Sequence, residues 1–191
     1  ISNKVTEFRR SEFVGPTISS ELLWKGLQAI TFSLIAILIY IWLRFEWQFG
    51  FGAVVALAHD VIFTLGVLSL FKIDFSLSSI AAILTIAGYS INDSVVIFDR
   101  IRENLRKYKK LELPDLFNIS INNTLSRTIM TSITTLLALS CLFIFGGEVI
   151  KPFAFAMIIG VIIGTYSSIF IAVPTLLIFK FRPQEEDNSL I

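Results

Sequence analysis

Residues 77–98 read LSSIAAILTIAGYSINDSVVIF, an apolar run that carries the carboxylate of Asp93 near its end. A helix needs ~20 apolar residues to cross a bilayer, and this run is long enough. A charged residue at that depth costs at least ~2.5 kcal/mol on insertion scales, so an intramembrane acid is a functional candidate by default. The stretch therefore predicts a membrane helix that handles protons or ions.

The composition of the whole chain points to the same environment. The chain has 191 residues, of which 54% are hydrophobic and 16% charged, whereas soluble domains have about 45–50% and about 25%. Apolar windows of ~20 residues predict five spans, at 26–43, 49–71, 77–98, 128–145 and 153–179. We therefore expect an all-α integral membrane protein with a transmembrane domain over 24–182 and the lipid bilayer as its surroundings. The net charge of +1 gives no reason to expect a nucleic-acid partner.

The basic residues of the short connections predict the orientation of the spans. Arg44 follows the first span, a basic cluster fills 100–127, and Lys180 and Arg182 follow the fifth, whereas the other two connections hold only Lys72 and Lys151. Lys and Arg are enriched on the cytoplasmic side of membrane proteins. We therefore expect the N-terminus outside and the C-terminus in the cytoplasm.

The two ends of the chain differ from its middle. Residues 1–23 alternate polar and apolar side chains up to Gly15-Pro16, which predicts the last strand of an external domain and its linker. An odd number of spans with an external start predicts a further helix and most of that domain upstream. Residues 183–191 are polar and acidic, and we expect a disordered cytoplasmic tail there.

The connection 100–126 is the only long polar segment, and we expect it to be cytoplasmic and helical. Glu103 and Lys107 form an i,i+4 pair that favours extension of the third span as a helix. Pro114 and Asp115 are typical of a helix start, because proline suits the first turn and a carboxylate suits the positive end of the dipole. This second short helix is predicted to lie on the cytoplasmic face of the membrane. A partner-binding helix is the alternative.

Polar side chains recur at helical spacing in the third and fourth spans. They are Tyr89, Asn92 and Asp93 on one side, and Arg127, Thr128 and Thr131 on the other. Asp93 precedes the end of its span by about 9 Å at 1.5 Å per residue, and Arg127 begins the antiparallel neighbour. We therefore expect an Asp93–Arg127 contact, direct or through water. It is either a functional pair or a buried ion pair that only holds the bundle together.

His59 and Asp60 lie near the middle of the second span. Burial disfavours the charged carboxylate, which makes Asp60 a candidate proton carrier, with an assembly role as the alternative. Adjacent side chains on a helix point about 100° apart, so we do not expect both to face the same partner. For His59, a packing hydrogen bond and a place in a proton relay both remain open.

The fifth span carries small residues at intervals of four, namely Gly160, Gly164 and Ser168. Such a surface lets another helix approach closely. Pro174 predicts a kink near the end of the same span. We expect no metal site, no catalytic residue and no enzymatic activity, and no cofactor other than protons as the coupling ion.

Several stretches in order along the chain resemble the SecF family, which supplies the smaller subunit of the SecDF protein-export complex. They are Val14-Gly15-Pro16, Arg44-Phe45-Glu46, His59-Asp60, the run 88–104, Arg127-Thr128 with Thr131-Ser132, and the run 164–168. The segment Ile91-Asn92-Asp93-Ser94 is similar to SecF rather than to its paralogue SecD. The resemblance covers essentially the whole chain.

The resemblance implies the RND superfamily, and with it five helices of a six-helix transmembrane half plus a remnant of an external α/β domain. It implies SecD and the SecYEG channel as partners in the bacterial inner membrane, and preproteins as substrates met through the missing periplasmic domain. The proton-motive force would drive the process. Asp93 and Arg127 match the intramembrane acid and arginine of proton conduction, which face a SecD acid, and Asp60 matches a further family residue.

Two other functions are compatible with the same residues. In the first, the buried charges only lock the two subunits together, and the chain is a non-conducting assembly scaffold. In the second, the chain belongs to an RND-type small-molecule exporter, although this sequence holds no large substrate-binding porter domain. The effect of Asp93→Asn on export in an assembled complex distinguishes scaffold from conductor.

Overall fold

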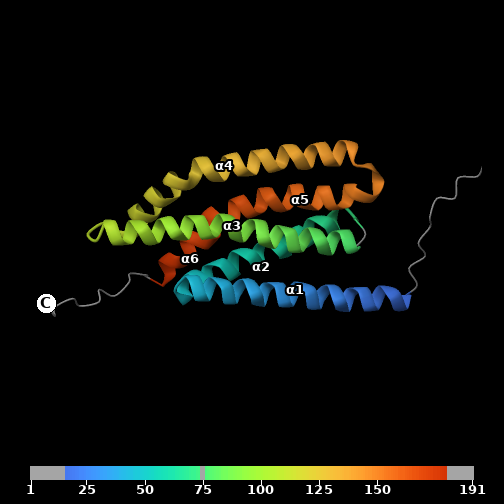
Figure 1. Ribbon diagram of the computed structural model, residues 1–191, viewed down its shortest axis with the longest axis horizontal. Helices are drawn as coiled ribbons and strands as arrows, with labels where there is room; N and C mark the ends of the chain where they lie inside the picture. The colour runs from blue at the N-terminus through green and yellow to red at the C-terminus, as the bar shows by residue number, and fades with distance from the viewer. Residues whose placement is uncertain (1–15, 74–75, 180–191) are drawn as a thin grey trace, which may run out of the picture.

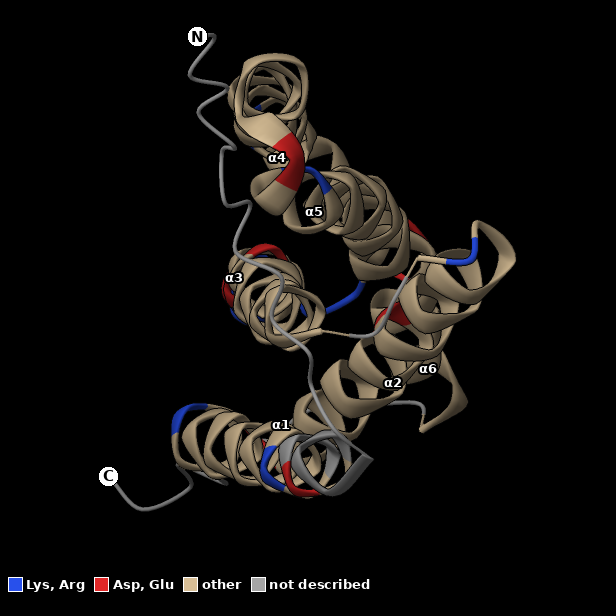
Figure 2. Ribbon diagram, turned by 90° about the vertical axis from the view of Figure 1, so that its right-hand side faces the viewer, with Lys and Arg blue, Asp and Glu red and all other residues tan. Residues whose placement is uncertain are grey.

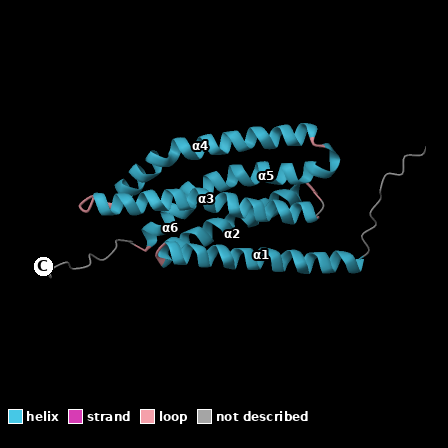
Figure 3. Ribbon diagram, in the orientation of Figure 1, coloured by secondary structure: helices cyan, strands magenta, loops and turns pink. Residues whose placement is uncertain are grey.

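The computed structural model describes residues 16–73 and 76–179, and every regular element within them is a helix (Figures 1 and 3). The elements are α1 (Pro16–Arg44), α2 (Trp47–Leu70), α3 (Leu77–Lys107), α4 (Leu113–Phe145), α5 (Gly147–Ser167), the π-helix η1 (Ser168–Ala172) and α6 (Val173–Ile178). Five helical stretches are long and apolar enough to span a membrane, the fifth being α5 through α6. The predicted all-α membrane fold is therefore confirmed. The predicted strand in 1–15 and the tail at 183–191 lie outside the described residues.

Two helices begin earlier than the sequence predicts. α1 begins at Pro16, so the part of the expected linker from 16 to 23 is helical, because proline is well suited to a first helical turn. α4 runs without interruption from Leu113 to Phe145, which joins the expected short helix at Pro114 to the expected span at 128. The chain has neither glycine nor proline between Asp115 and Phe145 that would end the helix.

The helices lie side by side in an elongated bundle (Figure 1). Seen along its axis, α3 lies between the α4–α5 pair and the α1–α2 pair (Figure 2). α3 packs against all four of these neighbours, whereas α1 packs on α2 and α3, and α4 packs on α3 and α5. A residue of α3 can therefore meet side chains from any of the other spans.

Two apolar clusters hold the two ends of the bundle. One contains the rings of Phe45, Phe49 and Phe98, with centroids 5.2 Å apart for Phe49–Phe98 and 6.2 Å for Phe45–Phe98. The other contains Ile86 of α3 and Val161 of α5, both buried. Because lipid tails are as apolar as these side chains, close packing rather than exclusion of water stabilises both clusters in a membrane.

The fifth span changes its helical geometry at η1. Pro174 has no amide hydrogen, so the carbonyl of Phe170 cannot receive the usual bond from it, and the ring crowds that carbonyl. Local π geometry is one way in which a helix accommodates such a defect. α2 approaches closely here, since a Cβ on Gly52 would lie 2.9 Å from the carbonyl oxygen of Ala172. The irregularity expected from Pro174 thus takes the form of a π turn just before the proline.

Candidate functional site

Polar side chains from four spans meet between the two apolar clusters. On α2, α3 and the fifth span, they fall between the residues that belong to one cluster and those that belong to the other. We call this set the polar layer. It consists of two acids, Asp60 and Asp93, and of the four hydroxyl residues that donate hydrogen bonds to them, which are Ser90, Thr128, Ser167 and Ser168. The layer contains both intramembrane acids that the sequence singled out.

Asp60 of α2 is fully buried and receives hydrogen bonds from two other helices. The hydroxyl of Ser90 on α3 donates to its Oδ2 at 2.5 Å, and the hydroxyl of Ser167 on α5 donates to the same oxygen at 2.7 Å. The exposed fraction of Asp60 is 0%. An acid so deeply buried needs these donors, because an unpaired polar group in an apolar interior is costly.

His59 completes the surroundings of Asp60. Its Nδ1 lies 3.1 Å from Oδ1 of Asp60, and its side chain is 33% exposed. We expected the two neighbouring side chains to point to different partners, and the structure instead brings them into contact with each other. An imidazole with one ring nitrogen on a buried carboxylate and one edge toward the surroundings is suited to pass a proton inward.

Asp93 of α3 is half-buried and bonds the opposite side of the bundle. Thr128 of α4 donates to its Oδ1 at 2.7 Å, and Ser168, the first residue of η1, donates to its Oδ2 at 3.1 Å. Both carboxylate oxygens therefore receive a hydroxyl hydrogen. Asp93 links three helical segments, as Asp60 does.

Ser167 and Ser168 connect the two acids, because these consecutive residues bond Asp60 and Asp93 respectively. Sequence reasoning missed Ser90 altogether and treated Ser168 only as a small packing residue. A signal was available in hindsight: a pair of adjacent hydroxyls, Ser167-Ser168, stands at the polar end of the small-residue stripe. Adjacent residues face about 100° apart, which lets them serve two different acids.

Further hydroxyl groups continue the layer between α3, α4 and α5. The hydroxyls of Ser132 and Thr165 are 2.7 Å apart, and the Tyr89 hydroxyl lies 3.5 Å from that of Ser132, at the outer limit for a hydrogen bond. Tyr89 therefore lies on the α4 side of α3, as Asp93 does. This is the side on which the sequence placed both residues.

The sequence predicts an Asp93–Arg127 contact, either direct or through water, and the part of the chain that the structure describes shows no direct one. Arg127 is exposed, and within 16–73 and 76–179 no ion pair joins it to Asp93. The reason is geometric: Thr128 is turned toward Asp93, and the preceding residue on the same helix points about 100° away. The guanidinium instead lines a cavity of ≈ 380 Å³ between α1, α3 and α4, into which Asp99 and Glu103 also project.

Two other predicted polar residues lie outside the polar layer. Asn92 is exposed on α3, whereas its neighbour Asp93 is half-buried. Thr131 is also exposed, and its hydroxyl donates to the carbonyl oxygens of Arg127 and Thr128 at 3.1 and 3.0 Å. Such local bonds satisfy a threonine in an apolar environment without any partner helix.

The small residues of the fifth span face α3. A Cβ on Gly164 would lie 3.1 Å from Cβ of Ser90, and one on Gly160 would collide with the side chain of Ile86. Ser168 continues the stripe and bonds Asp93. The close approach of the two helices thus brings Ser90, Ser167 and Ser168 within reach of the acids.

Replacement of Gly164 by leucine is expected to lower the stability of the bundle by about 1–3 kcal/mol, because the new side chain would displace Ser90. The measurement is thermal unfolding of the purified protein in detergent. Gly66→Leu is the control, since nothing lies within 4 Å of a Cβ at Gly66. Equal midpoints for the two variants would contradict the close α3–α5 packing.

The chemistry of the polar layer suits proton exchange. A hydroxyl can donate to a carboxylate and, after rotation, accept from a carboxylic acid, so both protonation states of Asp60 and Asp93 keep their partners. A fixed cation such as lysine would favour only the charged state. Within the described residues, no group of three His, Cys, Asp or Glu side chains is placed to hold a metal ion.

Comparison with known proteins gives consistent matches. The family described as "Protein export membrane protein SecD/SecF, C-terminal" matches residues 2–182. Protein translocase subunit SecF of Rickettsia rickettsii (strain Sheila Smith) is 58% identical over 176 residues, which are 92% of this chain and 57% of the relative. The SecF subunit of Rickettsia bellii (strain OSU 85-389) is 58% identical over 180 residues, or 94% of this chain and 59% of the relative. The chain thus spans under two thirds of the length of these relatives.

Solved structures match as well. The crystal structure of SecDF, a translocon-associated membrane protein from Thermus thermophilus, superimposes with a TM-score of 0.83 at 47% identity, over 87% of this chain and 23% of that one. A second structure, of SecDF in a super-membrane-facing form, gives a TM-score of 0.78 at 44% identity, over 87% of this chain and 22% of that one.

Proposed function

Because this chain belongs to the SecD/SecF family of protein-export membrane proteins, we propose that it works with a SecD subunit to assist Sec-dependent translocation of preproteins. The pair acts beside the SecYEG channel in the bacterial inner membrane and draws its energy from the proton-motive force. The role is transport rather than catalysis, and protons are the coupling ion. Preproteins are met by a periplasmic domain outside this sequence.

The observation that carries the proton-coupled part of this proposal is the pair of acids in the polar layer. Asp60 and Asp93 are bonded by the adjacent hydroxyls of Ser167 and Ser168, at 2.7 and 3.1 Å. Intramembrane acids that hydroxyl groups can satisfy in either protonation state are suited to load and release protons. A change of charge at either acid alters its bonds to the fifth span, which offers a physical route from protonation to movement.

Arg127 supports the pairing with a second subunit. A guanidinium on a spanning helix is expensive unless protein or water covers it, and Arg127 is exposed in the described part of this chain. We propose that an acid of SecD faces Arg127 in the assembled complex. In this proposal, a change in the charge of Asp93 affects Arg127 through Thr128, its neighbour on α4, rather than through a direct ion pair.

The orientation follows from the basic residues at one end of the bundle. Arg44 ends α1, and Arg106 and Lys107 lie in the last turn of α3. Since positive residues are enriched on the cytoplasmic side, we place this end in the cytoplasm and the start of α1 on the periplasmic side.

The scaffold function is the alternative, and one observation favours it. Asp60 is fully buried and its donors come from within this chain, as in a polar anchor that only holds helices together. In that case the acids matter for assembly with SecD and carry no protons.

The experiment that decides between them uses the full-length protein in vesicles with SecD and the channel. Proton flux and preprotein release are measured with an imposed proton gradient and after its collapse by an uncoupler. We expect release to rise with the gradient only in vesicles that contain the pair. Gradient-independent release, with no flux above that of empty vesicles, would leave the scaffold function.

A further inference from the structure

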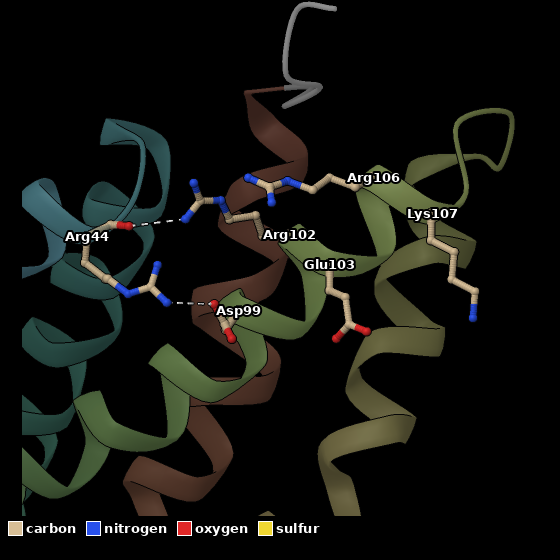
Figure 4. Close-up of a pocket in the computed structure, with 6 residues that line it drawn as sticks. All are labelled: Arg44, Asp99, Arg102, Glu103, Arg106 and Lys107. Carbon is tan, nitrogen blue, oxygen red and sulfur yellow. Dashed lines mark hydrogen bonds and ion pairs between the residues drawn. The ribbon is translucent and has the colours of Figure 1, made fainter.

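A charged groove lies at the end of the bundle where α1 and α3 end. Its volume is ≈ 640 Å³, and its walls are Arg44, Asp99, Arg102, Glu103, Arg106 and Lys107. Figure 4 shows the guanidinium groups of Arg102 and Arg106 turned toward each other, while that of Arg44 points to Asp99. The groove thus gathers more basic than acidic groups.

The acids of the groove are already occupied. Asp99 forms an ion pair with Arg44 at 3.2 Å, and Glu103 is paired with Arg100, which lies outside the groove, at 2.7 Å. Arg102 donates to the backbone carbonyl of Arg44 at 3.4 Å. Within the described residues, therefore, neither Arg102 nor Arg106 has a carboxylate partner.

Helix stability alone does not explain this arrangement. Basic residues in a last helical turn favour the helix dipole, which accounts for Arg106 but not for Arg102, a turn earlier. Two like charges at i and i+4 repel each other and destabilise a helix. An anion between the two guanidinium groups would remove that repulsion.

The groove lies beside the membrane surface. Arg44 directly follows Trp42 and Leu43, whose side chains are 64% and 84% exposed at the end of a spanning helix. Exposed tryptophan is typical of the level of the lipid headgroups. The charged groove thus follows directly on the exposed apolar end of α1 along the chain, so a phospholipid can place its anionic headgroup in the groove and its acyl chains along α1.

We propose that Arg102 and Arg106, with Arg44, bind the phosphate of an anionic phospholipid in this groove. A guanidinium presents a planar fork that matches two phosphate oxygens, and basic pockets between membrane helices are suited to such headgroups. The site is separate from the polar layer and does not depend on proton coupling.

The test measures lipid binding to the purified full-length protein in nanodiscs and by native mass spectrometry after exchange of lipids. The probes are phosphatidylglycerol, phosphatidylcholine with the same acyl chains, and inorganic phosphate. We expect the wild-type protein to retain phosphatidylglycerol selectively. In Arg102→Gln/Arg106→Gln, the Kd for phosphatidylglycerol should rise at least about tenfold.

Two further variants keep the test decisive. Lys109→Gln/Lys110→Gln removes the same charge from the same end of the bundle but outside the groove, and it should retain most of the affinity. Arg102→Lys/Arg106→Lys keeps the charge without the fork and should bind with intermediate affinity. Equal loss in the two glutamine variants would reduce the effect to general surface charge and overturn the proposal. Equal retention of phosphatidylcholine, or binding of inorganic phosphate as tight as that of the lipid, would overturn it too.

Discussion

Asp93→Asn is expected to remove gradient-driven preprotein release while the protein still folds and assembles with SecD. Asparagine has nearly the same shape, and its carbonyl oxygen can still accept from Thr128, which donates to Oδ1 of Asp93 at 2.7 Å. Its amide can donate to the hydroxyl of Ser168 once that group rotates. The side chain, however, can no longer gain or lose a proton at physiological pH.

The magnitude follows from the energy of one proton. Each proton that descends a potential of 100 mV supplies ~2.3 kcal/mol, which biases a two-state equilibrium by about 50-fold. If one coupled proton passes through Asp93, loss of that bias should lower the release rate under the gradient by up to about that factor, to the rate measured without a gradient. The measurement is proton flux and preprotein release in vesicles at equal amounts of assembled complex.

Asp115→Asn is the matched control, because Asp115 is an exposed acid in the first turn of α4, away from the polar layer. It should leave both rates close to those of the wild type. If Asp93→Asn also retains wild-type flux and release, proton coupling does not pass through this acid, and the scaffold function is preferred.

Asp60→Ala is expected to lower the free energy of unfolding by about 2–4 kcal/mol. The variant removes the acceptor of two interhelical hydrogen bonds, each worth ~0.6 kcal/mol on average in a membrane and up to ~1.7. It also leaves a small cavity and a buried Ser90 hydroxyl without its acid. Ser167 loses less, because its hydroxyl can still donate to the carbonyl of Gly164, 3.2 Å away.

The measurement is unfolding in detergent, with Asp115→Ala as the control. Since Asp115 is exposed, the control should lose under about 1 kcal/mol. Removal of a buried charge can also increase stability. An Asp60→Ala variant as stable as the wild type, or more stable, would show that Asp60 is not needed to hold the bundle and would favour a role in proton transfer.

The two acids occupy comparable positions that differ in access. Asp60 is fully buried and reaches the exterior through His59, whereas Asp93 is half-buried and bonds α4 next to Arg127. The single irregular turn of the fifth span, η1, begins at Ser168, the residue that bonds Asp93. π turns are frequent at functional sites. Here the boundary between α5 and the π turn falls between Ser167 and Ser168, the serines that bond the two acids.

The sequence by itself determined the environment of the chain, the number of its spans and the two acids within them. Those conclusions depend only on hydrophobicity along the chain and on the cost of a charge in a bilayer, which are local properties. The predicted helix boundaries were less accurate where a helix continues into a polar segment. α4, for example, begins well before the apolar run at 128, because helical structure continues wherever no glycine or proline ends it.

Only the tertiary structure decided which side chains meet. The spacing of residues within a helix gives the angle between Arg127 and Thr128 on α4, and between His59 and Asp60 on α2. It does not give the rotation of either helix relative to its neighbours. Here that rotation is set by packing, since Gly160 and Gly164 admit Ile86 and Ser90 of α3 at contact distance. This contact turns Ser90 and Ser167 toward Asp60, and α4 then offers Thr128 rather than Arg127 to Asp93. The partners of the acids thus follow from steric fit between helices far apart in the sequence, which no local pattern encodes.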